Sequence, residues 1–154
     1  MAVTHIQINY PPAEDLDPDL LLSAAEAVYE AVGGVEETEL AITIIGEFEI
    51  HELNLNYRNI DAPTDVLAFP DGEINPETGK SYLGDVVIAY PIAVVQAEEE
   101  GHRVADELQL LVIHGILHLL GYEHDNDQGG EGMWLVQRKA LDRLGSPIKS
   151  ENWI

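Results

Sequence analysis

The sequence contains no cysteine, so neither a disulfide framework nor a thiolate metal site can form. Any transition-metal site must therefore use histidine and carboxylate side chains. No apolar run approaches membrane-spanning length, and no Gly-rich phosphate loop follows a predicted strand, which argues against membrane spans and nucleotide-binding folds. The opening residues MAVTHIQINYPP lack the basic and apolar regions of a secretory leader. We therefore expect a cytoplasmic protein without a membrane partner.

Basic residues are scarce, with seven Lys and Arg against 29 Asp and Glu, for a formal net charge of −22. This balance predicts repulsion from nucleic acids and from anionic membranes. The acidic surface is explained by solubility, or alternatively by adaptation to a salty cytoplasm, where screening shortens the reach of the repulsion. Any contact with a polyanion must therefore be local.

Length and composition favour one domain that spans residues 1–154, with 45% apolar and 23% charged residues. Strands are predicted at residues 5–10, 39–46, 66–70 and 83–90, and helices at 18–34, 47–60, 91–101, 102–120 and 133–145. Their irregular order predicts an α+β fold in which a small mixed β-sheet packs against helices. The helix at 102–120 is apolar at nearly every position after Gln109, which predicts a buried central helix.

The central helix ends in HGILHLLGYEH, residues 114–124, where three histidines follow a zinc-ligand spacing. His114 and His118 lie one turn apart on one helix face. Gly121 allows a left-handed turn after which His124 can supply a third nitrogen. The alternative is a set of core or capping histidines, but buried imidazoles without partners cost about 1–3 kcal/mol each. The pattern therefore predicts a metal-binding central helix like that of zincin peptidases.

Zinc suits three imidazoles and one open position, and nickel and copper are not excluded by affinity. Three neutral ligands leave the charge of the ion uncompensated, which suits an anionic substrate. Gly115 stands where zinc peptidases carry a glutamate general base. Hydrolysis of a phosphodiester needs that base less than peptide hydrolysis does, because a metal-activated water is already largely ionised.

Acidic residues crowd the segment after the helix, at Glu123, Asp125, Asp127 and Glu131. They either orient the histidine rings, accept a proton from the metal-bound water, or form a solvated acidic loop. Asp125 is the best candidate for a catalytic role. Two alternatives stay open: a zinc peptidase with Glu123 or Asp125 as its base, and a non-catalytic protein whose structural zinc takes Asp125 as fourth ligand.

Three segments together resemble one family. HGILHLLGYEH resembles the signature HGxLHLxGYDH of the YbeY endoribonucleases, ELNLNYRNIDAPTDVLAFP is similar to their second motif, and LGDVVIA to their third. The motifs span residues 52–124 in the family's order. Glu123 replaces a common Asp, and Ala68 replaces a frequent Ser, and neither change touches a predicted ligand.

The resemblance implies a metal-dependent endoribonuclease that prefers single strands, matures the 3′ end of small-subunit ribosomal RNA and takes part in ribosome quality control. It implies zinc ligands at His114, His118 and His124, and a functional arginine at Arg58. A guanidinium there would bind a phosphate oxygen; the alternative for Arg58 is a surface salt bridge to Asp61 or Asp65. The implied partners are ribosomal RNA, the small ribosomal subunit and a ribosome-associated protein. With this resemblance, the non-catalytic alternative is a ribosome assembly factor with structural zinc.

Overall fold

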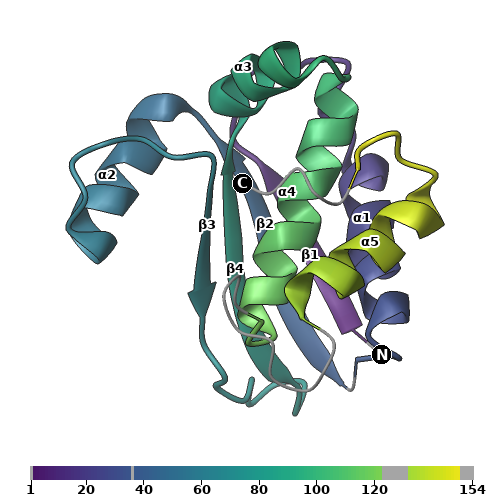
Figure 1. The fold of residues 1–154 in the computed structure, drawn as a ribbon. Helices are drawn as coiled ribbons and strands as arrows, with labels where there is room; N and C mark the ends of the chain where they lie inside the picture. The colour runs from purple at the N-terminus through teal and green to yellow at the C-terminus, as the bar shows by residue number, and fades with distance from the viewer. Residues whose placement is uncertain (1, 36, 123–131, 150–154) are drawn as a thin grey trace.

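The computed structural model describes residues 2–35, 37–122 and 132–149. In chain order the elements are β1 (Ala2–Ile8), α1 (Pro18–Ala31), β2 (Thr38–Ile45), α2 (Glu47–Arg58), β3 (Val66–Pro70), β4 (Ser81–Ala89), α3 (Tyr90–Glu100), α4 (Val104–Leu119) and α5 (Met133–Leu144). All the predicted strands and helices are present. Their arrangement is shown in Figure 1.

The strands form a four-stranded mixed sheet in the order β1-β2-β4-β3. β1, β2 and β4 run parallel, whereas β3 is antiparallel to β4 and forms one edge. The helices lie against this sheet (Figure 1), so the predicted α+β fold with a small mixed sheet is confirmed. None of the helices in the described ranges combines the length and the apolar character needed to cross a membrane.

Local signals in the sequence determine where the helices begin and end. Asp17 caps α1 by accepting a hydrogen bond from the Asp19 backbone N–H at 2.9 Å, and Pro18 occupies the first turn. Gly101 and Gly145 end α3 and α5 in the left-handed conformation. α2 ends in the same conformation without a glycine, because Asn59 adopts φ 59° there.

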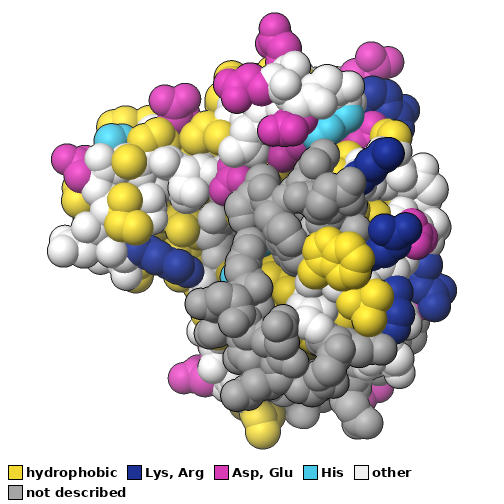
Figure 2. Space-filling model, in the orientation of Figure 1, with side chains coloured by type: hydrophobic (Ala, Val, Ile, Leu, Met, Phe, Trp, Pro, Cys, Tyr) yellow, Lys and Arg dark blue, Asp and Glu magenta, His cyan; other side chains and the backbone are white. Residues whose placement is uncertain are grey.

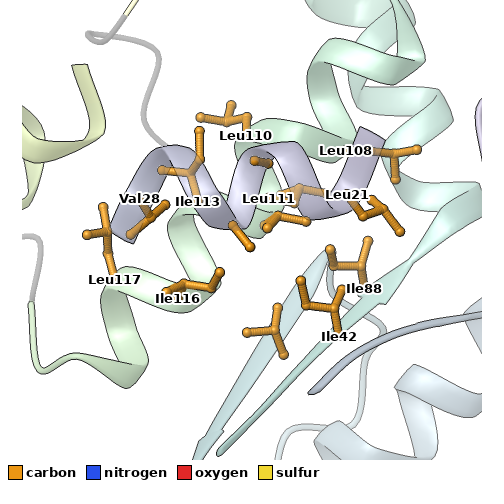
Figure 3. Packing of buried hydrophobic residues seen from close by; sticks show 14 of the residues in the cluster. Leu21, Val28, Ile42, Ile88, Leu108, Leu110, Leu111, Ile113, Ile116 and Leu117 are labelled. Carbon is orange, nitrogen blue, oxygen red and sulfur yellow. The ribbon is translucent and has the colours of Figure 1, made fainter. Parts of the chain in front are cut away.

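α4 is the centre of the hydrophobic core. It packs against β3 and β4 on one side and against α1 on the other, and α5 covers α1 and α4 from outside. Figure 3 shows the side chains of this core converging from α1, α4, β2 and β4. Its fully buried members include Leu21, Ile42, Ile88, Leu111 and Ile116. The prediction of a buried central helix is therefore confirmed.

α2 packs on the opposite face of the sheet, at the edge formed by β3 and β4. Ile50 and Leu53 of α2 contact a second apolar cluster that includes Leu67 and Val87. Most of the remaining surface of α2 is exposed, so the helix forms a lobe beside the body of the molecule (Figure 1). Its C-terminal end, with Arg58, reaches the outer edge of β3.

Some predicted boundaries were wrong. The first strand begins at Ala2 and ends at Ile8, because the whole segment pairs in parallel with β2 from Thr38 to Ile44. The predicted strand through Tyr90 ends one residue earlier, since Tyr90 is already the first residue of α3. These strand ends depend on the partner strand and not on local alternation.

Gly84 lies at an irregularity of β4, where the pairing with β2 skips from Tyr82 to Gly84. Its φ is +144°, and a Cβ added there would lie 2.3 Å from the Phe69 carbonyl oxygen. We expect Gly84→Ala to lower the free energy of unfolding by about 2–4 kcal/mol, because it combines backbone strain with overpacking. Chemical denaturation measures this change.

Gly79→Ala is the matched control. Gly79 also has a positive φ, +73°, but an added Cβ there would have no atom within 4 Å. Its cost should be near 1 kcal/mol, from backbone strain alone. Equal costs at the two positions would contradict the proposed role of close packing at Gly84.

Candidate active site

His114 and His118 come from the last two turns of α4 and point at one place. His114 is 4% exposed, and His118 is half-buried. Their Nε2 atoms lie 3.1 Å apart, and their ring centroids lie 4.7 Å apart. Two nitrogens bound to one tetrahedral zinc ion at about 2.0–2.1 Å would be roughly 3.4 Å apart. The two histidines therefore fit a shared metal ion through the same ring atom of each.

α4 ends in the left-handed turn that the sequence predicted at Gly121. Gly121 has φ +95°, and the backbone N–H of Tyr122 donates to the Leu117 carbonyl at 3.0 Å. The Gly121 N–H donates to the His118 carbonyl, also at 3.0 Å, which completes a Schellman turn. The chain thus leaves the helix directly after the second histidine.

The predicted third ligand, His124, and the predicted catalytic residue, Asp125, lie outside the described residues, as do Glu123, Asp127 and Glu131. Within the described ranges, no three histidine or carboxylate side chains converge as a metal site. The structure therefore describes the position of two of the three predicted ligands, His114 and His118. The roles assigned to the other residues stay predictions.

Gly115, between the two histidines, is in close contact with the sheet. A Cβ added to Gly115 would lie 2.5 Å from Cγ1 and 3.0 Å from Cγ2 of Val86 in β4. Gly115 therefore lets α4 approach β4 more closely than any other residue would allow. A glutamate in this position, as in zinc peptidases, would push α4 away from the sheet.

Arg58 reaches the same region from the end of α2. One guanidinium nitrogen donates to the Ala68 carbonyl of the edge strand β3 at 2.8 Å, and Cζ lies 5.9 Å from the centroid of the Phe69 ring. Neither alternative salt bridge is formed: Asp61 pairs with His51 at 2.7 Å, and Asp65 accepts the Val66 N–H at 2.8 Å. Within the described part of the chain, Arg58 has no carboxylate partner.

The histidines and Arg58 line one cleft of about 390 Å³. The surface is hollowed between the lobe of α2 and the body of the molecule (Figure 2). The other lining residues are Thr64, Asp65, Val66, Ala68, Pro70 and Gly115. The cleft is therefore formed by α4, by the edge strand β3 and by the loop before it.

The loop between α2 and β3 is held by side chains that sequence reasoning did not single out. Asn54 is 4% exposed, and its amide donates to the Ala62 carbonyl at 2.8 Å. Asp65 accepts the Val66 N–H and also the Thr64 hydroxyl at 3.3 Å. All lie in the segment that resembles the second motif, but their residue types alone do not reveal their contacts.

A buried acid lies on α4, two turns before His114. Glu107 is 1% exposed and interacts with His102. Burial raises the pKa of the Glu107 carboxyl, the contact with His102 opposes that increase, and the negative charge of Asp65 adds to it.

Outside the cleft, several basic side chains are paired with acids. Lys80 lies 3.6 Å from Glu37, Arg103 binds Asp106 at 3.0 Å, and Arg143 lies 2.9 Å from Glu30. In the view of Figure 2, most Lys and Arg side chains gather near α5, away from the α2 lobe. Among the residues that line the cleft, positive charge therefore comes from Arg58, in agreement with the scarcity of basic residues in the sequence.

The fold and the cleft define the class: an α+β protein in which a candidate histidine metal centre and an arginine line one cleft. A family profile described as endoribonuclease YbeY matches residues 13–145. The chain is 42% identical to the endoribonuclease YbeY of Moorella thermoacetica over 94% of this chain and 96% of that protein. It is 44% identical to that of Pelotomaculum thermopropionicum, over 82% and 83%.

The fold is shared with the solution structure of TM1509 from Thermotoga maritima, with a TM-score of 0.59 and 29% identity over 98% of this chain and 97% of that one. The chain belongs to the endoribonuclease YbeY family. This confirms both the resemblance found in the sequence and the expectation that the protein is an enzyme, an endoribonuclease.

The contact between Gly115 and Val86 predicts energetic coupling. Gly115→Ala alone should lower the free energy of unfolding by about 1–3 kcal/mol, because the new methyl group overlaps the Val86 side chain. In a Val86→Ala background, the same substitution should cost at least ~1 kcal/mol less, because the overlapping methyl groups are gone. Denaturation of the four proteins of this double-mutant cycle measures the coupling; additive costs would contradict the close packing.

Proposed function

We propose that this protein is a zinc-dependent endoribonuclease that cleaves single-stranded RNA and matures the 3′ end of small-subunit ribosomal RNA. Zinc is held by His114, His118 and His124, and Arg58 binds the scissile phosphate. The proposal includes a role in ribosome quality control in the cytoplasm, together with a ribosome-associated protein partner. Family membership supports the RNA substrate, and the cleft supports the assignment of residues.

One observation carries the proposal: in a chain with a net charge of −22, Arg58 faces the same cleft as His114 and His118 without a carboxylate partner among the described residues. An arginine left unneutralised in so acidic a protein favours an anionic substrate. The Ala68 carbonyl holds one of its nitrogens, so other N–H donors stay available for a phosphate.

When bound, zinc supplies a Lewis acid and an activated water at a pH near neutrality. Side chains of the protein then hold the metal centre, orient the phosphate and accept a proton. His114 and His118 hold the centre from a rigid helix, while Arg58 orients the phosphate and stabilises the charge that develops on its oxygens. Asp125 is the proposed proton acceptor.

The peptidase alternative is disfavoured by the packing of Gly115. A peptidase of this ligand frame takes a proton with a glutamate at that position and returns it to the leaving amine. The contact of Gly115 with Val86 leaves no room for such a side chain. The base would have to come from Glu123 or Asp125, and loss of peptide cleavage on replacing either residue would support this alternative.

The structural-zinc alternative makes a different prediction. If Asp125 closed the fourth position of the metal, the protein would need zinc to fold but would not cleave RNA. Removing zinc with a chelator and following unfolding tests the first half of this statement, and the cleavage assay tests the second half.

The proposal predicts cleavage of a single-stranded ribosomal RNA fragment by the zinc-loaded protein. His118→Ala should abolish both cleavage and stoichiometric zinc binding, because one ligand is lost. Arg58→Ala should keep zinc but lower kcat about 10²–10³-fold, the loss expected for one donor to a developing charge. Gel analysis of products measures cleavage, and calorimetry measures zinc binding.

His5→Ala and Lys80→Ala are the matched controls, since both residues lie outside the cleft and each contacts an acid, Glu39 and Glu37 respectively. Both should leave cleavage unchanged. Cleavage that survives His118→Ala, or no cleavage by zinc-loaded protein at low and high salt, would overturn the catalytic proposal and favour the structural-zinc alternative.

Binding of RNA through a small contact area also predicts that the affinity depends only weakly on salt concentration. Binding of single-stranded RNA should weaken with a slope of about −1 to −2 in log K against log salt, because few phosphates are neutralised. Fluorescence anisotropy at several salt concentrations measures this slope. A slope steeper than about −4 would show many released counterions and contradict binding through the cleft alone.

A further inference from the structure

Large exposed aromatic side chains are concentrated on α2. Tyr57 is 71% exposed and directly precedes Arg58 in the last turn of the helix. Phe48, at the other end of the same helix, is also 71% exposed. An exposed aromatic ring beside an arginine proposed to bind the substrate needs an explanation, because the exposure of its hydrophobic surface to water is unfavourable.

Tyr57 is held against the edge strand by Phe69. Their ring centroids lie 5.5 Å apart at an interplanar angle of 67°, an edge-to-face contact. Phe69 is half-buried, and the Arg58 guanidinium carbon lies 5.9 Å from the centroid of the Phe69 ring. Phe69 thus joins Tyr57 to Arg58, and the ring of Tyr57 is fixed on one side and open on the other.

The position of this aromatic pair follows from the alternation of β3. Ala68 and Pro70 line the cleft, whereas Phe69 belongs to the cluster on the α2 face of the sheet. Arg58 crosses the edge between the two faces, since it both lines the cleft and contacts Phe69. A phosphate bound to Arg58 therefore has the histidines on one side and the aromatic pair on the other.

We propose that Tyr57, supported by Phe69, is a stacking platform for one unpaired nucleobase next to the phosphate bound by Arg58. This inference rests on the proposed function and adds a binding subsite to it. Every nucleobase has a face that can stack on tyrosine, so the platform accepts any sequence. A base within a duplex is already stacked on its neighbours, so the platform selects single strands.

The stacking platform also explains how a protein with a net charge of −22 could bind RNA. Stacking is much less sensitive to salt than ion pairing is, and it adds affinity without further Lys or Arg. A chain with only seven basic residues can thus hold a polyanion by one arginine, one metal centre and one aromatic ring. The hydroxyl of Tyr57 is not required for stacking, which separates Tyr57→Phe from Tyr57→Ala.

The test measures cleavage of a single-stranded ribosomal RNA fragment by the zinc-loaded wild type, Tyr57→Ala, Tyr57→Phe and Phe48→Ala. Tyr57→Ala should raise KM about tenfold, within the loss expected for one base–aromatic stack, while kcat changes less than twofold. Tyr57→Phe should restore the KM of the wild type. Phe48→Ala, with equal exposure on the same helix, should leave both constants unchanged.

A second readout separates stacking from a structural role of Tyr57. Binding of single-stranded DNA is followed by anisotropy, with one base at a time replaced by an abasic site. One abasic position should weaken binding to the wild type about tenfold but have little effect on Tyr57→Ala, because the platform is already absent. A structural role would weaken all the oligonucleotides equally.

The outcomes distinguish the two proposals. If the wild type cleaves RNA and Tyr57→Ala has the KM of Phe48→Ala, the platform is excluded while the proposed function stands. If the wild type cleaves nothing, the proposed function fails, and the abasic series still decides whether Tyr57 binds a base. Equal sensitivity of the wild type and Tyr57→Ala to every abasic site excludes the platform in either case.

Discussion

The close approach of α4 to β4 at Gly115 is the contact on which the rest of the site depends. Because Val86 occupies the space that a side chain at Gly115 would need, the helix lies directly on the sheet and brings both histidines beside the edge strand. A residue between two metal ligands is an obvious place for a catalytic base. Here the same residue serves packing, so the chemistry must rely on groups contributed by other segments.

Those groups come from α2 and from the edge of the sheet. α2 has little buried surface of its own, but its last turn places an arginine against β3 and across from the histidines. The strong negative charge of the chain makes this placement specific, since basic residues elsewhere, such as Lys80 and Arg143, are paired with acids. Charge composition and the geometry of the cleft thus both support the proposal that RNA is bound over a small area.

Much of this arrangement could be predicted from sequence, because its signals are local. Histidine spacing placed His114 and His118 on one face, and Gly121 marked the turn after them. Other features depend on contacts between distant segments and have no local signal. The steric reason for Gly115 is Val86 in another element, and the strand limits at Ala2 follow from pairing with β2. The partnership of Tyr57 with Phe69 likewise needs the fold, although both residues lie in one motif.

The hydrogen bond from Arg58 to Ala68 has a further consequence for the edge strand. Asp65 and Asp71, on either side of β3, hydrogen-bond to Ala89 and Leu83. By the alternation of an antiparallel pair, Val66, Ala68 and Pro70 therefore direct their backbone groups away from β4. The Val66 N–H is taken by the Asp65 side chain, the Ala68 carbonyl by Arg58, and Pro70 has no N–H to offer. An incoming strand would lack one hydrogen-bond partner at each of these three positions, which disfavours pairing at this sheet edge. Residues that form the cleft thus also make the edge a poorer template for strands of other chains.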